Sequence, residues 1–506
     1  MKMKKYIKKL TAICLMGAML CGTTGCTDSF EEINTDPDNA VQVPNANLLA
    51  YSLYFTSYRL NDRWFSMDEP MTFAGYVSKM SYIDEARYNF RTGVQDANWA
   101  YVYRALNNVM DLQRRAGDVS LNLLNVAKVL EVYLMQTATD RWRDVPYTEA
   151  VRMEEEFLTP AYDKQEEIYP ALLARLKEAA DGFAAGGSDD IAAGDLLFHG
   201  DLQKWQKFCN SMRLRLAIRI SKVASELARS TVEEVLGNPD KYPVMTSNDE
   251  NAFFWWQGSD SNYYEPIADA YRTRKTEYCA SDVMVDNLLN HNDPRISVYC
   301  KPTPSSLIEG DDDYTDGTPV YRGYPIGASS NATAKNYSIW GYRFGQDLGG
   351  FSPWMRVAEV YFHIAEAALL GYNTASYGDA ASNYEKGVRF SMEENEVKAA
   401  DIDAYLAAAG RFDNSLKKIW YEEWVAMFKQ GMEGWSLYRR TGIPENHYIA
   451  PGRPAQYADH NVPPFRSPYP ATELNLNGVN NAPFNAEVVD NLWGKPMWWD
   501  TREGVH

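Results

Sequence analysis

Apolar side chains recur at intervals of three and four residues in several long stretches, and this spacing constrains the fold more than any other feature of the chain. In the clearest stretch Arg213, Arg215 and Arg219 share one helix face, and the opposite face is apolar (Leu202, Trp205, Phe208, Cys209, Met212, Leu216 and Ile220). This spacing is typical of an α-helix with one buried stripe. Similar spacing occurs in residues 123–138 and 357–367, and helices are also expected near residues 98–114, 165–183 and 415–429. The sequence therefore predicts an all-α fold.

Several of the predicted helices follow one another closely along the chain. This order favours stacked helical hairpins, the unit of tetratricopeptide arrays. The residue pattern of that repeat does not recur at a fixed period, so the array is an inference from the order of the helices alone.

The N-terminus resembles a secretory signal, because Lys2, Lys4, Lys5, Lys8 and Lys9 precede the apolar run of residues 10–20. That run is too short to span a bilayer. Residues 20–26 (LCGTTGC) resemble a bacterial lipobox, so residues 1–25 are predicted to be a lipoprotein signal peptide and Cys26 to be the acylated residue. Two or more acyl chains would anchor the protein stably. The alternative is an ordinary cleaved signal with an incidental cysteine.

Composition divides the remaining chain into a tether and one large body. Residues 26–47 are polar and contain two prolines, which favours an extended lipidated tether. Residues 48–506 contain no Ser/Gly-rich linker and are interpreted as a single domain. Its helical scaffold is expected at about 48–245 and 353–442, its loop-rich variable region at about 246–352, and an irregular C-terminal segment at 443–506.

Charge and cysteine usage exclude several partners. The formal net charge is −18, and removal of the signal peptide would make it more negative because that peptide holds five lysines and no acid. This argues against nucleic acid and against anionic lipid headgroups, so membrane contact is expected only through acyl chains. Cys209, Cys279 and Cys300 lack metal-binding spacing; Cys209 is expected to be a buried thiol, and pairing of the other two stays open.

Common catalytic motifs are absent from the sequence. A glycosidase-type pair of carboxylates stays possible, because its members need no fixed spacing in sequence. Residues 311–317 carry Asp311, Asp313 and Asp316, which are weak candidates for calcium binding. Tyr314 stands where an EF-hand needs an acid or amide, so a solvated acidic loop is favoured and neither metal nor cofactor is expected.

Aromatic side chains are unusually frequent in the loop-rich region, together with Asn, Asp, Gln and Arg. An aromatic ring flanked by amides and carboxylates fits both the apolar face and the hydroxyls of a sugar. The alternative is that many of these rings fill a core. The ligand-binding candidates are Trp255, Trp256, Tyr263, Tyr264, Tyr314, Tyr321, Tyr324 and Trp340, with Tyr82, Tyr88, Asn89 and Arg91 from an earlier loop.

Residues 139–150 (TDRWRDVPYTEA) resemble the TD-x-W-G-D-V-P-Y-S-E-A signature of the SusD/RagB outer-membrane lipoproteins of Bacteroidetes, with Arg143 in place of the usual glycine. Further elements of that family are matched in order by residues 160–169, 200–217, 356–367, 420–424, 434–444 and 466–473, and by the pair Trp498 and Trp499. From the residues alone these motifs are interpreted as structural: caps, packed aromatics and buried Arg–Glu pairs.

The resemblance implies a tetratricopeptide-like helical scaffold with a variable, loop-built ligand region. It also implies a lid on a SusC-like TonB-dependent barrel, which captures oligosaccharides or peptides at the cell exterior and passes them inward. We therefore expect a non-catalytic, lipid-anchored outer-membrane protein that binds glycan. The alternatives are a peptide-binding member of the family and, less favoured, a glycoside hydrolase.

Overall fold

The structure is a computed structural model that describes residues 43–506 except 118, 153–154, 260, 262, 275 and 488–491. The expected signal peptide, Cys26 and most of the tether lie outside the described residues. Helix α3 (Asn45–Leu60) begins within the segment expected to be a tether, so the folded body starts slightly earlier than the sequence indicates.

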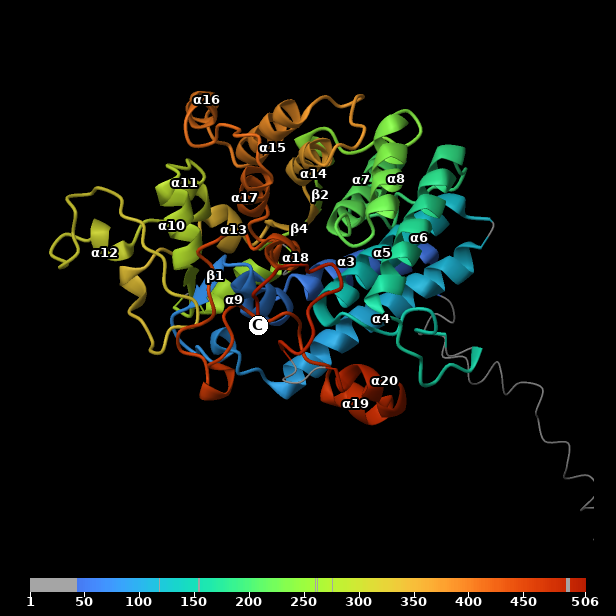
Figure 1. Ribbon diagram of the computed structural model, residues 1–506, viewed down its shortest axis with the longest axis horizontal. Coiled ribbons are helices and arrows are strands. Elements are labelled where there is room, and N and C mark those ends of the chain that lie inside the picture. The colour runs from blue at the N-terminus through green and yellow to red at the C-terminus, as the bar shows by residue number, and fades with distance from the viewer. Residues whose placement is uncertain are drawn as a thin grey trace, which may run out of the picture.

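The N-terminal half consists of successive helices that pack as hairpins, each against the next (Figure 1). After α3 these are α4 (Thr92–Ala116), α5 (Leu121–Trp142), α6 (Gln165–Ala185), α7 (Leu202–Arg219) and α8 (Ser225–Gly237). Their shared core contains the buried indoles of Trp142 and Trp205. The predicted all-α scaffold with tetratricopeptide-like hairpins is confirmed.

A second group of helices lies beside the first. It consists of α14 (Val357–Leu369), α15 (Ala380–Glu394), α16 (Ala399–Ala407), α17 (Leu416–Ala426) and α18 (Gly431–Thr441). Helix α14 packs against α15, α17 and α7, so it joins the two groups. The helix predicted at residues 415–429 corresponds to α17, which ends at Ala426, three residues earlier than expected.

Helix starts are fixed by short polar side chains. Asp201 accepts hydrogen bonds from the backbone N–H groups of Gln203 and Lys204 at the start of α7, and Ser415 accepts one from Lys418 at the start of α17. These caps satisfy N–H groups that have no partner within the helix. Gly442 ends α18 in the left-handed conformation, at φ 76°, which glycine adopts without strain.

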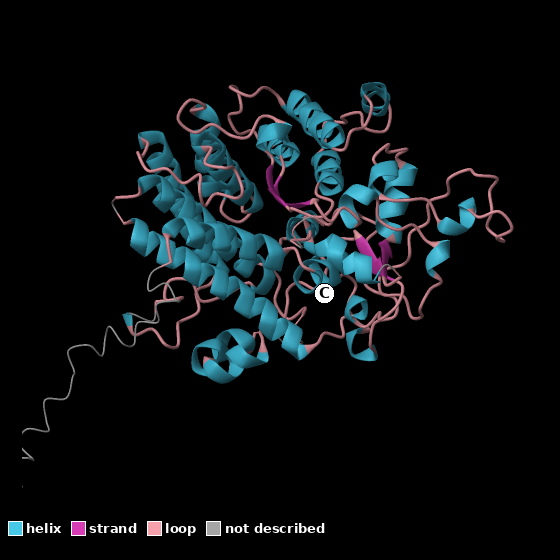
Figure 2. Cartoon of the chain, turned by 180° about the vertical axis from the view of Figure 1, so that it is seen from behind, coloured by secondary structure: helices cyan, strands magenta, loops and turns pink. Residues whose placement is uncertain are grey.

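In sequence, the loop-rich region lies between the two helical groups, and its strands are short and few among the described residues (Figure 2). Its regular elements are β2 (Ala252–Trp255), α9 (Pro266–Arg274), β3 (Tyr278–Ala280), α10 (Asp282–Asn290), α11 (Ile296–Tyr299), α12 (Pro304–Leu307), α13 (Tyr342–Gly345) and β4 (Phe351–Met355). Strand β3 pairs antiparallel with β1 (Val77–Lys79), which lies beyond the π-helix Arg63–Met71.

The two ends of the loop-rich region are tied together. Strand β2 pairs antiparallel with β4, with Trp255 opposite Phe351. Just beyond β2, the N–H of Trp256 donates to Gly350 O at 2.9 Å, and the N–H of Glu265 donates to Leu348 O at 2.9 Å. The segment 256–265 is therefore held at both ends on the folded body.

The described part of the C-terminal segment contains the short α-helices α19 (Ala471–Leu476) and α20 (Gly478–Asn485) and a 3-10 helix (Ala455–Tyr457). The chain then returns to the core, where Trp499 is fully buried. Its indole N–H donates to Asp140 at 3.2 Å.

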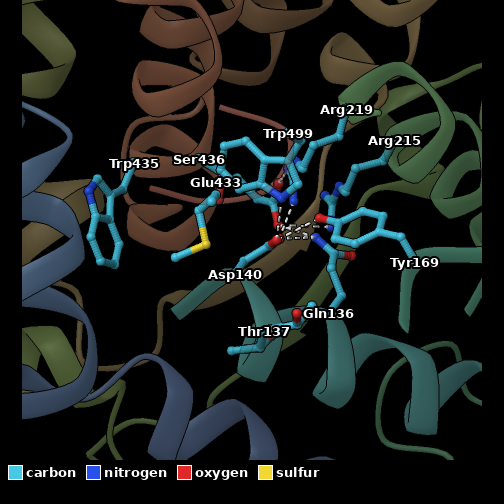
Figure 3. A network of polar contacts seen from close by, with 12 residues as sticks. Gln136, Thr137, Asp140, Tyr169, Arg215, Arg219, Glu433, Trp435, Ser436 and Trp499 are labelled. Carbon is cyan, nitrogen blue, oxygen red and sulfur yellow. Dashed lines mark hydrogen bonds and ion pairs between the residues drawn. The ribbon is translucent and has the colours of Figure 1, made fainter. Parts of the chain in front are cut away.

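A buried polar network joins α5, α7 and α18 (Figure 3). Arg219 pairs with both Asp140 and Glu433, and Gln136 Nε2 donates to Glu433 Oε1 at 2.8 Å. Arg215 binds Glu359 of α14 through two nitrogens, at 2.5 and 2.8 Å. The motif residues interpreted as structural from the sequence thus hold helices together.

Candidate functional site

Aromatic side chains of α3 and of the segment 256–265, some exposed and some half-buried, lie together. Tyr263, which is 53% exposed, meets the ring of Tyr54 edge to face at a centroid distance of 5.7 Å. Tyr54 stacks on Tyr58 one helical turn later, at 5.9 Å and 14°. Tyr51 lies one turn earlier on the same helix and is 45% exposed. We call Tyr51, Tyr54, Tyr58 and Tyr263 the aromatic surface.

Trp256 supports this surface from below. It is only 6% exposed, and its ring meets Tyr54 at 5.7 Å and Tyr58 at 5.9 Å, both edge to face. The indole N–H donates to Ser352 Oγ at 2.9 Å, which fixes the ring. The sequence candidate Trp256 therefore supports the half-buried Tyr54 and Tyr58 and offers little ring surface itself.

Sequence reasoning missed the three tyrosines of α3. Their positions, 51, 54 and 58, follow the three- and four-residue spacing of one helix face. That spacing was visible in the sequence, but the helix fell within the segment expected to be part of the tether and the scaffold.

Charged groups border the aromatic surface. The guanidinium of Arg59 lies over Tyr58 at 4.9 Å and over Tyr101 of α4 at 4.5 Å. Burial raises the pKa of Tyr58, Arg59 opposes this rise, and Asp62 and Asp269 add to it. The Tyr58 hydroxyl therefore stays protonated at neutral pH. Rings with hydroxyl, guanidinium and carboxylate groups beside them suit a ligand with an apolar face and polar edges.

Three other aromatic candidates are buried in the core. Trp340 is fully buried and lies near Phe428, at 6.0 Å, and Tyr324 packs against Tyr337. Tyr88 is 2% exposed, and its hydroxyl accepts a hydrogen bond from the Ala450 N–H. Their rings fill space between segments distant in sequence, so a ligand cannot reach them in this structure.

The remaining candidates are at least partly accessible, but they do not join the aromatic surface through any described ring contact. Trp255 is exposed on the other face of β2, against Phe351 at 5.4 Å. Arg91 pairs with Glu85 at 2.9 Å and lies over Trp64 at 5.1 Å. Tyr82, Asn89 and Tyr314 are exposed, Tyr321 is half-buried, and Tyr264 lies beneath the guanidinium of Arg272.

The acidic loop pairs with basic side chains. Asp311 binds Lys335 at 2.6 Å, and Asp313 lies 3.4 Å from Arg322, while Asp316 is exposed. The hydrogen bond from Lys335 lowers the pKa of Asp311. Across the described ranges, no group of three His, Cys, Asp or Glu side chains is arranged to hold a metal ion.

Several buried carboxyl groups with raised pKa values have structural partners. Burial raises the pKa of Glu69, Asp140 and Glu265, against the opposing charges of Arg141, Arg219 and Lys429 respectively. Burial also raises the pKa of Asp62 to about 6, and its Oδ1 accepts a hydrogen bond from the Phe65 N–H at 2.8 Å. Burial and existing hydrogen bonds tie these carboxyls to the fold, which favours structural roles over acid–base chemistry.

Comparison with known proteins identifies the class. A SusD-like family model, described as starch-binding and associating with the outer membrane, matches residues 37–470. The chain belongs to this SusD-like family.

Solved structures agree in fold. A chitin-binding protein shares 26% identity, with 91% of this chain and 100% of that chain covered and a TM-score of 0.78. A SusD homologue from Bacteroides thetaiotaomicron shares 21% identity over 91% and 100%, with a TM-score of 0.74. A chitin-binding SusD homologue from Flavobacterium johnsoniae shares 23% over 90% and 97%, with a TM-score of 0.73. No curated protein matches the sequence significantly.

Helices long and apolar enough to cross a membrane are absent from residues 43–506 as far as the structure describes them. Cys209, Cys279 and Cys300 are buried free thiols, which answers the question left open about Cys279 and Cys300.

Proposed function

We propose that this chain captures glycan at the aromatic surface. The observation that carries the proposal is that the half-buried Tyr54 and Tyr58 pack on the fixed ring of Trp256, with the exposed Tyr263 beside Tyr54. Pre-positioned rings bind a sugar face without first losing conformational freedom. Membership of the SusD-like family and likeness to a chitin-binding protein at 26% identity support a glycan as ligand.

Calorimetric titration with chitohexaose, maltohexaose and cellohexaose tests the binding. We expect one of these to bind, and the double variant Tyr54→Ala/Tyr263→Ala to raise its Kd by about 10-fold or more, because stacked aromatic contacts are each worth roughly 0.5–1.5 kcal/mol beyond buried area. Tyr448→Ala is the control, since this ring is 69% exposed elsewhere on the surface. Unchanged affinity in the double variant would show that the ligand binds at another place.

Two further measurements on the purified protein test the alternatives, a glycoside hydrolase and a peptide-binding protein. New reducing ends after incubation with the bound oligosaccharide would establish hydrolysis and contradict a purely binding role. Binding of peptides from a random library, without binding of any glycan, would favour the peptide-binding alternative.

We further propose that Cys26 carries acyl chains that anchor the protein to the outer membrane, facing the exterior, and that captured glycan passes to a SusC-like TonB-dependent barrel. Cys26→Ala is expected to release the protein from the membrane fraction; persistent membrane association would contradict anchoring at this residue. Purification of the tagged, anchored chain in detergent should bring one TonB-dependent barrel in stoichiometric amount. Its absence would contradict the transporter partnership.

A further inference from the structure

A depression of about 340 Å³ lies at the end of α10 and is lined by none of the residues that form the aromatic surface. We call it the α10 pocket. It is lined by α10 (Asn287 and Asn290, with His291 just beyond), by the start of α17 (Lys417, Lys418 and Tyr421, preceded by Asp413) and by residues 443–446. Volumes of this size lie within the usual range for small-ligand sites.

The rings and apolar groups of the α10 pocket are fixed. His291 stacks on Tyr421 at a centroid distance of 4.3 Å and 29°. The Tyr421 hydroxyl lies 2.9 Å from His291 Nδ1. Ile443 and Pro444 are buried and add apolar surface to the same depression. The pocket therefore combines ring and aliphatic surface with polar edges.

Several hydrogen-bonding groups of the pocket are unused. His291 Nδ1 lies 2.8 Å from the carbonyl oxygen of Asn287, which only accepts, so in the neutral ring Nδ1 is the donor and Nε2 the acceptor. Asn446 uses its Oδ1 to accept from Asn287 at 2.7 Å. Among the described residues, His291 Nε2, the Asn446 amide nitrogen and both polar atoms of Asn290 have no hydrogen-bond partner. The pocket thus offers a ligand an acceptor nitrogen on His291, an amide NH2 donor on Asn446 and the complete side-chain amide of Asn290.

The lysines do not make this an anion site. Lys417 pairs with Glu445 at 2.6 Å, and Lys418 donates to the Ala409 carbonyl at 2.6 Å. Asp413 supplies another negative charge at the rim. With its cations engaged and carboxylates beside them, the pocket favours a neutral ligand that both donates and accepts hydrogen bonds.

We infer that the α10 pocket binds a single neutral pyranose unit, separately from the aromatic surface. Amides and an imidazole nitrogen suit vicinal hydroxyls, which donate and accept at once, and the ring and aliphatic walls suit the C–H face of the sugar. The choice of a sugar as ligand rests on the proposed function, but the residues that line the α10 pocket are different from those of the aromatic surface. The protein would thus hold two parts of one glycan, or two glycans.

The ring nitrogens of His291 provide a local reporter. In full-length protein labelled with ¹⁵N-histidine, the His291 signals are assigned by their loss in His291→Gln. Titration with N-acetylglucosamine, and separately with glucose, should shift the Nε2 signal saturably for at least one sugar, because that nitrogen accepts a hydroxyl hydrogen bond.

Two variants and one control give the test its specificity. Asn290→Ala removes a side chain without a described partner, so it leaves the fold intact, and Asn446→Ala removes the free amide donor; each should raise the apparent Kd by about 10-fold, the effect of roughly 1.4 kcal/mol. Tyr54→Ala/Tyr263→Ala should leave the His291 titration unchanged.

The results separate this inference from the proposed function. Absence of a His291 shift with both sugars overturns the α10 pocket, even if chitohexaose or another oligosaccharide binds at the aromatic surface. A shift that Asn290→Ala and Asn446→Ala leave unchanged also overturns it. A saturable shift lost in those variants supports the pocket, while loss of oligosaccharide binding in the tyrosine variant independently tests the aromatic surface.

Discussion

At the scale of single residues, the arginines of α7 show how burial of a charge depends on partners from other elements. Arg213, Arg215 and Arg219 occupy a helix face that reads as polar in sequence, yet each is at most 7% exposed. Carboxylates reach them from other parts of the chain: Glu234 of α8 pairs with Arg213, and Glu359 of α14 pairs with Arg215. A buried charge is tolerated only when it is paired and hydrogen-bonded.

Replacing Arg219 with leucine should destabilise the protein strongly. The substitution leaves Asp140 and Glu433 buried beside each other without their shared cation, and loss of one partner of a buried pair costs about 3–5 kcal/mol. Urea unfolding measures the change. Arg229→Ala, which breaks an exposed pair with Glu233, is the control and should cost well under ~1 kcal/mol. Similar losses in both variants would refute the structural role of the network.

Asp62 predicts a pH dependence of stability. Burial raises its pKa from 3.8 to about 6, so the folded state binds this proton more tightly than the unfolded state. The carboxylate therefore lowers stability above pH 6, by about 3 kcal/mol, and this loss disappears as the pH falls through 6 towards 4.

Asp62→Asn should accordingly be more stable than the natural protein at pH 8 and nearly equal to it at pH 4, because asparagine also accepts the capping hydrogen bond from Phe65. The free energy of unfolding in urea, measured across this pH range, gives the difference. Asp201→Asn, the same change at an exposed helix cap, serves as control. A stability difference that does not vary with pH would contradict the raised pKa.

At the scale of elements, helix contacts depend on small residues at specific places. Gly387 of α15 lies against the buried ring of Phe362 in α14, and an added Cβ would approach Phe362 Cε1 to 2.7 Å. This close approach lets the two helices pack tightly beside each other.

Gly387→Ala should therefore lower the melting temperature, with an overpacking cost of about 1–3 kcal/mol that exceeds the gain in helix propensity. Gly93→Ala, in the first turn of α4 where an added Cβ meets nothing within 4 Å, should raise it slightly. Thermal unfolding of both variants compares the two effects. Stabilisation by Gly387→Ala would show that the α14–α15 contact is looser than described.

Arg143 shows how an element boundary tolerates an unexpected residue. It follows α5 at φ 74°, where the resembling signature has glycine and where a side chain is strained. Its Nε donates to the Pro496 carbonyl at 2.8 Å, and its guanidinium also pairs with Asp144. These contacts offset part of the backbone strain and fix the C-terminal segment to α5.

At the scale of the whole molecule, the two helical groups are expected to unfold together. Helix α14 contacts α7 directly, the buried network links α5 and α7 to α18, and the pairing of β2 with β4 closes the loop-rich region. Calorimetry should therefore show one transition whose calorimetric and van't Hoff enthalpies agree. Two resolved transitions would contradict the single-domain prediction for residues 48–506.

Much of the architecture was predictable because it depends on local patterns. The spacing of apolar residues predicted α5, α7 and α14 nearly at their observed bounds, and the ordered motifs indicated the family. Helix periodicity is a property of ten to twenty neighbouring residues, so one sequence contains it. The change in composition near residues 246–352 also falls close to the segment between β2 and β4.

The candidate ligand surface was less predictable, because burial in a loop-rich region depends on distant segments. The sequence does not distinguish Trp340 and Tyr88 from Trp255 and Tyr263, because all four lie in loop-rich segments. In the structure, however, Trp340 packs near Phe428 and Tyr88 packs against Ala450. The tyrosines of α3 become a surface only because the segment 256–265 is held beside them.

The sequence by itself therefore determined the helical class, the order of the main helices and the family, since these follow from local spacing and contiguous motifs. Only the tertiary structure decided which rings stay open to solvent and which arginines are buried with carboxylates. Those outcomes depend on contacts between residues far apart in the chain, and the free energy of each burial is set by partners that no local pattern identifies.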